Sequence, residues 1–211
     1  MQKIVIASRN QGKIAEFKEL LKDLPVEILT LNDFPSIPEI QETGSSFREN
    51  ALLKARAVTA YTGLIALADD SGLEVDCLGG APGVYSSRYA GPEQDDAANN
   101  RKLLAALEGV PLYQRTGRFR CVIAITTPEG GEYLSEGVCE GLIALEPRGD
   151  GGFGYDPLFI VPALGKTFAE LGPEVKNRIS HRAQAMRNAR ELLRRILGRT
   201  EGKRDASGDT E

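Results

Sequence analysis

Residues 3–31 read KIVIASRNQGKIAEFKELLKDLPVEILTL. Residues 3–8 are mostly apolar and β-branched, as in a short buried strand, and residues 26–31 repeat that character. Between them the apolar residues recur at helical spacing, at Ile14, Phe17, Leu20, Leu21 and Leu24. A strand, a helix and a second strand in this order form a β-α-β unit, which predicts an α/β fold.

The rest of the chain extends this pattern into a mixed sheet. Strands are expected over residues 64–68, 73–78, 118–127, 132–145 and 157–161, and helices over 47–61, 95–107 and 174–197. Ser46 and Glu49 are spaced as a capping box at the start of the first of these helices. The turn of residues 128–131, PEGG, joins two β-rich runs as in a hairpin, so antiparallel strands are expected beside the parallel ones.

The length of the chain predicts a single domain. A chain of 211 residues buries roughly two-thirds to three-quarters of its surface on folding and needs no disulfides. The domain is expected to span residues 1–198, with no internal linker. Residues 199–211, RTEGKRDASGDTE, have almost no apolar side chains and are expected to form a disordered polar tail.

Charge and cysteine content exclude some classes of protein. The 26 Lys and Arg against 30 Asp and Glu give a net charge of −4, which argues against polymeric nucleic acid as the main partner. Cys77, Cys121 and Cys139 form no CxxC motif and are expected to be reduced. With no basic and apolar leader and no membrane-length apolar run, we expect a cytoplasmic protein without a membrane partner.

A polar loop follows the first predicted strand. Residues 8–13, SRNQGK, lie between a strand and a helix, where free backbone N–H groups and the helix dipole favour phosphate. The loop is not a Walker A motif, because Ile14 follows Lys13 and only one glycine is present. An ordinary turn with a surface lysine is the alternative for this loop taken alone.

An acidic set follows, made of Glu42, Asp69 and Asp70. Magnesium takes hard oxygen ligands and needs only one or two carboxylates besides substrate phosphates and water. The alternative is a solvated turn, which is disfavoured because the acidic pair directly follows the apolar run LIALA. Consecutive residues of an extended strand project to opposite faces, so Asp70 is expected in the site and Asp69 is expected to point away and hold the turn.

Two further segments could recognise a ligand. In residues 151–156, GGFGYD, glycines allow close backbone approach, aromatic rings offer stacking faces and an acid accepts hydrogen bonds. A hairpin whose aromatic side chains enter the core is the alternative. Residues 176–182, KNRISHR, hold the only histidine, which could equally be a surface or capping residue. No GxSxG motif or reactive cysteine accompanies it, so a nucleophilic triad is excluded.

Together these segments resemble the Ham1/inosine triphosphatase family of non-standard purine NTP pyrophosphatases over about residues 1–197. The resemblance is carried, in order, by SRNQGK, ETGSSFRENALLKA, DDSGLEVDCLGGAPG, GGFGYDP and ISHRAQA. Asn177 stands where other members can have serine. The resemblance implies an elongated, two-lobed fold around a long, highly twisted mixed sheet with flanking helices and a central cleft. It also implies Mg²⁺-dependent hydrolysis of ITP, dITP and XTP to the monophosphate and pyrophosphate, in a homodimer.

The resemblance also assigns site residues. Those that would bind the triphosphate are Ser8, Arg9, Asn10, Gln11, Gly12, Lys13 and Lys54. Glu42 and Asp70 would hold the metal, Asp70 would also accept a proton, and Ser71 would contact substrate. Those on the base and sugar side would be Phe153, Gly154, Tyr155, Asp156, Lys176, His181 and Arg182.

The residue types agree with such a reaction. Phosphoryl transfer needs positioning and charge neutralisation, which Lys13, Lys54 and Mg²⁺ would supply. Arg182 offers donors to a 6-oxo purine and would oppose the 6-amino group of adenine, while Phe153 could stack on the base. Two alternatives stay open: a Maf-like pyrophosphatase acting on pyrimidine or modified nucleotides, and a nucleotide-binding regulator without turnover.

Overall fold

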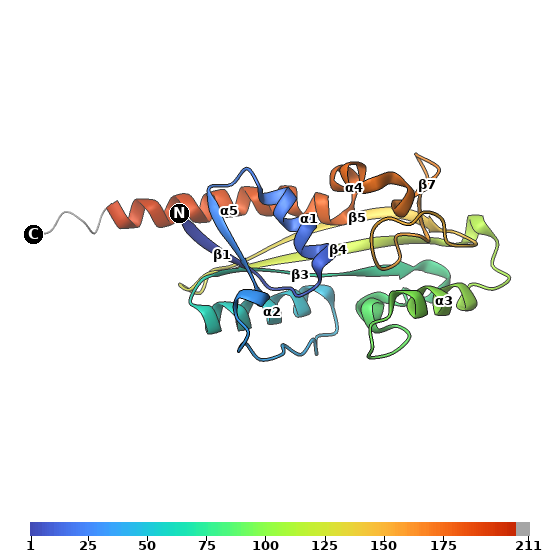
Figure 1. The fold of residues 1–211 in the computed structure, drawn as a ribbon, viewed down its shortest axis with the longest axis horizontal. Helices are drawn as coiled ribbons and strands as arrows, with labels where there is room; N and C mark the ends of the chain where they lie inside the picture. Colours follow the sequence, from blue (N-terminus) through green and yellow to red (C-terminus); the bar gives the residue numbers. More distant parts are fainter. Residues whose placement is uncertain (206–211) are drawn as a thin grey trace, which may run out of the picture.

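The computed structural model describes residues 1–205, and of residues 199–205 it describes only the backbone. Seven strands form one sheet in the order β2-β1-β3-β4-β5-β6-β7. Their bounds are Gln2–Ile6 (β1), Val26–Thr30 (β2), Ile65–Val75 (β3), Thr116–Thr126 (β4), Glu132–Ile143 (β5), Phe159–Val161 (β6) and Lys166–Thr167 (β7). β1 runs parallel to β2 and β3, and all later pairs are antiparallel. The predicted α/β fold with a mixed sheet is confirmed, and the molecule is elongated along β3, β4 and β5 (Figure 1).

Five α-helices flank the sheet. They are α1 (Gln11–Leu21), α2 (Phe47–Thr62), α3 (Asp96–Ala106), α4 (Phe168–Ile179) and α5 (His181–Asp205). α1 and α5 lie on one face of the sheet and α2 lies on the other (Figure 1). The expected capping residue of α2 is present, since Ser46 Oγ accepts a hydrogen bond from the backbone N–H of Glu49 at 3.2 Å. Within residues 1–205, no helix has the length and apolar content needed to span a membrane.

Three apolar clusters form the core, and their positions leave a place for a site. One lies between the sheet and α1 and α5, with Leu67 of β3 at its centre. A second lies between the sheet and α2, around Ala66 and Ala68. The third lies further along the sheet around Leu73 and Phe119, with α3 and α4. Residues 69–72 of β3 therefore lie between the first two clusters, at one end of the sheet, and the third cluster at the other end.

The acidic pair does not end a strand as expected. The sequence predicted a strand over 64–68, a turn at Asp69 and another strand from residue 73, but β3 continues unbroken from Ile65 to Val75. The reason is the neighbouring strand: β4 pairs with β3 all along this length and places Ile123 opposite Asp69 and Val122 opposite Asp70. Backbone pairing outweighs the low strand preference of Asp and Gly.

The C-terminal helical segment also differs from its prediction. Instead of one helix over 174–197 there are two, separated at Ser180, whose ψ of 160° is extended. Ser180 Oγ accepts a hydrogen bond from the backbone N–H of Ala183 at 3.1 Å, so this residue ends α4 and caps α5. α5 continues to Asp205, past residue 199 where the disordered tail was expected, because no proline interrupts it and each glycine costs only about 1 kcal/mol. Residues 206–211 of that expected tail lie outside the described residues.

Candidate active site

A cavity of about 310 Å³ opens beside the middle of β3. Its position follows from unequal strand lengths. β1 stays in register with β3 only as far as the pair Ile6 and Leu67, whereas β3 continues to Val75. Beyond Leu67 the edge of β3 is free of β1, and the loop that leads from β1 into α1 lines the opening. Side chains from both faces of β3 can reach this one cavity.

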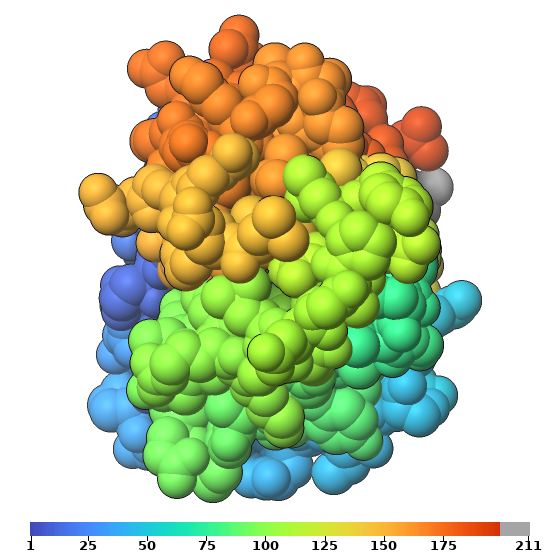
Figure 2. All heavy atoms as spheres, turned by 90° about the vertical axis from the view of Figure 1, so that its right-hand side faces the viewer, coloured from blue at the N-terminus to red at the C-terminus, as the bar shows by residue number. Residues whose placement is uncertain are grey.

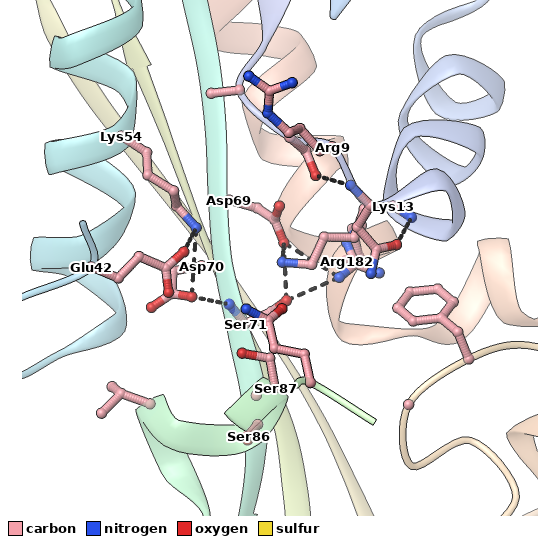
Figure 3. Close-up of a pocket in the computed structure, with 18 of the residues that line it drawn as sticks. Arg9, Lys13, Glu42, Lys54, Asp69, Asp70, Ser71, Ser86, Ser87 and Arg182 are labelled. Atoms are coloured by element: carbon pink, nitrogen blue, oxygen red, sulfur yellow. Dashed lines mark hydrogen bonds and ion pairs between the residues drawn. The ribbon is translucent and has the colours of Figure 1, made fainter. Parts of the chain in front are cut away.

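Asp69 and Asp70 project from β3 in opposite directions, as alternation along a strand requires (Figure 3). Asp70 faces α2, where its Oδ2 accepts a hydrogen bond from Asn50 Nδ2 at 3.0 Å. Asp69 faces α1 and α5, and its Oδ2 lies 3.1 Å from Lys13 Nζ and 3.3 Å from Arg182 Nη2. The expectation that Asp69 points away to hold a turn is wrong, because there is no turn and the open edge brings both carboxylates to the same cavity.

On the α2 side the acids share one lysine. Lys54 Nζ lies 2.7 Å from Glu42 Oε1 and 3.7 Å from Asp70 Oδ1. Burial raises the pKa of Asp70 above its usual value and Glu42 adds to the rise, while Lys54 and Lys13 only partly oppose it. Burial also favours a higher pKa for Glu42, but Lys54 holds the pKa of Glu42 below its usual value. Asp70 is therefore an incompletely neutralised carboxylate facing the cavity.

Glu42 and Asp70 fit a divalent cation that is shared with a substrate. No group of three or more His, Cys, Asp or Glu side chains suited to a metal occurs among the residues that the structure describes. Mg²⁺ does not require one, since one or two carboxylates usually hold it together with substrate phosphates and water.

On the α1 and α5 side, Asp69 is fully neutralised. Burial would raise its pKa, but Lys13 and Arg182 hold the pKa of Asp69 far below its usual value. Ser71 Oγ also donates a hydrogen bond to Asp69 Oδ2 at 2.9 Å. Asp69 thus anchors one cation from each of two helices.

The loop from β1 to α1 presents the N-terminus of α1 to the cavity. Ser8, Arg9, Asn10 and Lys13 line it, whereas the predicted residues Gln11 and Gly12 do not. Asn10 Oδ1 caps the helix by accepting a hydrogen bond from the backbone N–H of Lys13 at 3.0 Å. Gly12 acts by its lack of a side chain: a Cβ there would lie 2.5 Å from Cδ1 of Phe153. The aromatic ring of the Gly-rich segment therefore packs directly on the first turn of α1.

From Asp69 toward the interior of the protein, acidic and basic side chains alternate. Lys176 Nζ lies 2.9 Å from Glu16 Oε1 and 2.5 Å from Asp156 Oδ2, and Glu16 also pairs with Arg182. Burial would raise the pKa of Glu16, but Arg182 and Lys176 lower it below its usual value. Glu16 was not predicted from the sequence. Its only signal was its spacing of three residues from Lys13, which places both on one face of a helix.

Arg182 and His181 each leave one buried nitrogen without a partner in the described part of the chain. The Nη atoms of Arg182 bond Glu16, Asp69 and Ser71, whereas Nε has no partner. His181 stacks on Phe119 at 4.7 Å between ring centroids, with its Nδ1 unpartnered. Burial, with Arg182 and Lys176, lowers the pKa of His181 well below its usual value, so the ring is neutral. Buried polar groups rarely lack partners, so these two nitrogens are candidates for ligand contacts.

The Gly-rich segment is fixed by its own hydrogen bonds. The backbone N–H of Phe153 donates to Asp156 Oδ2 at 3.0 Å, and the buried Tyr155 donates its hydroxyl to the backbone oxygen of Ser86 at 2.8 Å. Burial raises the pKa of Asp156 despite its contact with Lys176. Tyr155 therefore joins this segment to the 3₁₀ helix Gly83–Arg88, which forms another wall of the cavity.

The structure brings together every predicted site residue except Gln11 and Gly12. Polar and aromatic lining residues that the sequence analysis did not assign are Glu39, Asp69, Ser86, Ser87, Gln94, Asp96 and Phe119. Apart from Asp69, these belong to loops, the 3₁₀ helix Gly83–Arg88, the start of α3 and β4, and form no recognisable motif. Only the fold brings them to the cavity.

Comparisons with known proteins agree on one family. The model of the Ham1 family matches residues 4–192. The chain is 55% identical over 194 residues to the dITP/XTP pyrophosphatase of Desulforamulus reducens, covering 92% of this chain and 96% of that protein. It is 53% identical over 198 residues to the dITP/XTP pyrophosphatase of Geobacter sulfurreducens, covering 94% and 98%.

Solved structures give the same result. A HAM1 protein from Coxiella burnetii is 49% identical, with a TM-score of 0.84, over 92% of this chain and all of that one (100%). The Ham1 protein of Staphylococcus aureus is 42% identical, with a TM-score of 0.82, over 92% and 98%.

Proposed function

The chain belongs to the Ham1 family, and we propose that it hydrolyses non-canonical purine nucleoside triphosphates (dITP, ITP and XTP) to the monophosphate and pyrophosphate. The observation that carries this proposal is the division of one cavity into two chemically different ends on either side of β3. One end holds Glu42, Lys54 and Asp70, and the other leads past Lys13 to the buried nitrogens of His181 and Arg182. A nucleoside triphosphate has two ends that match these, a charged triphosphate and a purine base.

The phosphate end supplies positive charge. Lys13 and Lys54 line it from two helices, and the N-terminus of α1 adds the positive end of a helix dipole. In the structure both lysines are paired with acids, so a triphosphate would compete with Asp69 and Glu42 for them. Such exchange lets the site hold four phosphate charges without burying unpaired lysines in the free protein.

We also propose that Mg²⁺ takes part, held by Glu42 and Asp70. When bound it would neutralise phosphate charge and polarise the scissile bond. The part of Asp70 is to orient the attacking water and accept its proton. In the free protein burial raises the pKa of Asp70. A bound Mg²⁺ would lower that pKa, so what supports this role is the place of the carboxylate at the phosphate end of the cavity.

The base end can distinguish a 6-oxo purine from adenine. Arg182 was expected to offer donors to the base, and the buried nitrogens without a partner at this end are Arg182 Nε and Nδ1 of the neutral His181. The 6-amino group of adenine is a donor and would face the N–H of Arg182 Nε, a mismatch of about 1–3 kcal/mol in a dry site. Phe153 supplies an aromatic face next to these groups.

A substrate panel tests the proposal. The purified protein would be incubated with ITP, dITP, XTP, ATP, UTP and dTTP, with Mg²⁺ or with EDTA, and the products separated. We expect monophosphate and pyrophosphate from the first three substrates only, and only with Mg²⁺. Equal turnover of ATP would contradict the proposal, preference for UTP or dTTP would indicate a Maf-like enzyme, and tight binding without turnover would indicate a regulator.

The homodimer and the cytoplasmic location stay predictions. Reduced Cys77, Cys121 and Cys139 agree with a reducing compartment, since the structure leaves all three thiols free. Sedimentation of the purified protein at several concentrations would measure the oligomeric state.

A further inference from the structure

Two side chains of helix α3 bind the Gly-rich segment at one residue, Gly154, through its backbone N–H and its backbone oxygen. Asp96 Oδ2 accepts a hydrogen bond from the backbone N–H of Gly154 at 2.7 Å. Asn100 Nδ2 donates a hydrogen bond to the backbone oxygen of Gly154 at 2.9 Å. The two side chains are four residues apart and so share one face of α3. Figure 2 shows the end of the molecule where the green segments around α3 meet the yellow and orange segments that follow β5.

α3 is itself a firm support. Asp95 caps it by accepting hydrogen bonds from the backbone N–H groups of Ala97 and Ala98. Asn99 is buried, accepts a hydrogen bond from the backbone N–H of Ala90 at 2.6 Å and donates one to the backbone oxygen of Ser87 at 2.9 Å. Leu103 fills the third apolar cluster. The start of α3 therefore joins two walls of the cavity, one carrying Ser87 and the other carrying Gly154.

Gly154 is the residue through which this support reaches the base end of the cavity. It follows Phe153, whose ring packs on Gly12 and lies 4.4 Å below Lys176 Nζ. Gly154 has a φ of +62°, and Gly151 and Gly152 lie shortly before it. Because glycine has more conformational freedom than any other residue, ordering this backbone costs more conformational entropy than ordering most loops. The bonds from Asp96 and Asn100 limit that freedom next to the aromatic ring.

We propose that Asp96 and Asn100 are positioning residues for base recognition: through Gly154 they fix the ring of Phe153 where the purine stacks. The role rests on the proposed function. It concerns only the base, because the ion pairs and hydrogen bonds described above for Lys13, Lys54, Glu42 and Asp70 go to residues outside α3. Loss of either bond weakens binding of the nucleoside part and leaves binding of a bare polyphosphate unchanged.

The test compares Asp96→Ala with two matched variants. Asp96→Asn keeps an oxygen that can accept the hydrogen bond from Gly154, and Asp95→Asn removes the neighbouring charge but keeps an oxygen that can cap α3. For each protein, affinities for inosine monophosphate and inorganic tripolyphosphate would be measured by calorimetry, with KM and kcat for ITP and the hydrogen exchange of residues 151–156. Turnover of ITP by the unaltered protein tests the proposed function separately.

In Asp96→Ala we expect the affinity for inosine monophosphate to fall about tenfold, the effect of losing one hydrogen bond to a charged group. KM for ITP should rise by a similar factor with kcat nearly unchanged, and exchange at residues 151–156 should accelerate. Tripolyphosphate should bind as before, and Asp96→Asn and Asp95→Asn should behave like the unaltered protein in all three respects. Asn100→Asp, which replaces the donor by an acceptor, should reproduce the loss. Unchanged affinity in Asp96→Ala, or an equal loss for tripolyphosphate, would overturn the inference.

Discussion

Asp69 and Asp70 are neighbours in β3, and burial favours a higher pKa for both, but their charged neighbours leave the two pKa values shifted in opposite directions. Asp69 contacts two cations and its pKa lies far below the usual value, whereas the pKa of Asp70 is raised. A lowered pKa means that the folded protein stabilises the charge, and a raised pKa means that folding disfavours it. One acid of the pair therefore contributes to stability, and the other is retained at a cost to stability.

The first prediction concerns Asp70→Asn. Because folding raises the pKa of Asp70, replacing the carboxylate by a neutral amide at pH 7 should leave the free energy of unfolding unchanged or increase it. Hydrolysis of ITP should fall by at least about a hundredfold, since an amide cannot accept the proton that a general base removes. Urea unfolding in EDTA and a pyrophosphate-release assay would measure the two effects. A destabilised but active variant would contradict the prediction.

Asp69→Asn should instead lower the free energy of unfolding. Removing this charge leaves Lys13 and Arg182 without their shared anion, and breaking a buried ion pair costs about 3 kcal/mol of unfolding free energy. The lowered pKa means that this stabilisation is complete above the ordinary aspartate range near pH 4 and is lost as the pH falls below it. KM for ITP should rise, although Lys13 no longer has to leave Asp69, because Lys13 and Arg182 line the cavity and lose the anion that positions them. Urea titrations at pH 7 and steady-state kinetics would decide. A stable, inactive Asp69→Asn beside an active Asp70→Asn would reverse the two roles.

Gly12→Ala should separate stability from nucleotide binding. Alanine in a helix is favoured over glycine by about 0.5–1 kcal/mol, so α1 should not be weakened. Its Cβ would meet Cδ1 and Cε1 of Phe153 at 2.5 and 2.8 Å, so the ring must move away from its position beside the base. Loss of a stacking contact should raise KM for ITP about tenfold.

Gly198→Ala is the matched control for that variant. Gly198 lies in α5, and a Cβ there would have no atom within 4 Å. It should gain the same helical stability with unchanged KM. Thermal unfolding and ITP kinetics of both variants measure the contrast, and equal KM values would show that Phe153 does not need its place against Gly12.

The sequence predicted the parts of the site that lie in short motifs. In the segments Ser8 to Lys13 and Phe153 to Asp156, the functional groups lie within a few consecutive residues. Such a motif can be recognised from the sequence without knowing the fold. Glu16 and Asp96 were missed because each acts through a partner more than fifty positions away, Glu16 through Arg182 and Asp96 through Gly154. One acid on a helix surface looks like any other until the packing is known.

The same reasoning explains the error at β3. Asp, Asp, Ser and Gly in succession are typical of a turn, because these residues form local hydrogen bonds and tolerate unusual backbone angles. What keeps them extended is the length of β4, which begins only at Thr116 and pairs with β3 from Ala66 to Val75. Propensity is local, whereas pairing depends on a strand that the local sequence does not reveal. The alternation of Asp69 and Asp70 was predicted correctly, since it needs only an extended backbone.

The last prediction concerns His181. It is the only histidine of the chain, so its titration is not mixed with that of another imidazole. Burial first, and then Arg182 and Lys176, lower its pKa well below 6.5. Below about pH 6.5 the unfolded chain therefore binds a proton that the folded protein does not, and stability must decrease as the pH falls. Between pH 6.5 and 5.5 this amounts to about 1 kcal/mol of unfolding free energy. Asp70 and Asp156, whose pKa values are raised, contribute with the opposite sign, so the unaltered protein alone cannot isolate the effect.

His181→Gln isolates it, because the variant keeps both acids and loses only the titrating ring. Its free energy of unfolding in urea, measured at pH 7.5, 6.5 and 5.5, should decline less on acidification than that of the unaltered protein, by about 1 kcal/mol over the last step. In the unaltered protein the imidazole proton resonances should not titrate between pH 8 and 5.5. Parallel pH profiles, or a resonance that titrates near pH 6.5, would show that the ring is protonated in the folded state. A charged ring beside Arg182 would then be a poor acceptor for a purine and a poor neighbour for a cation.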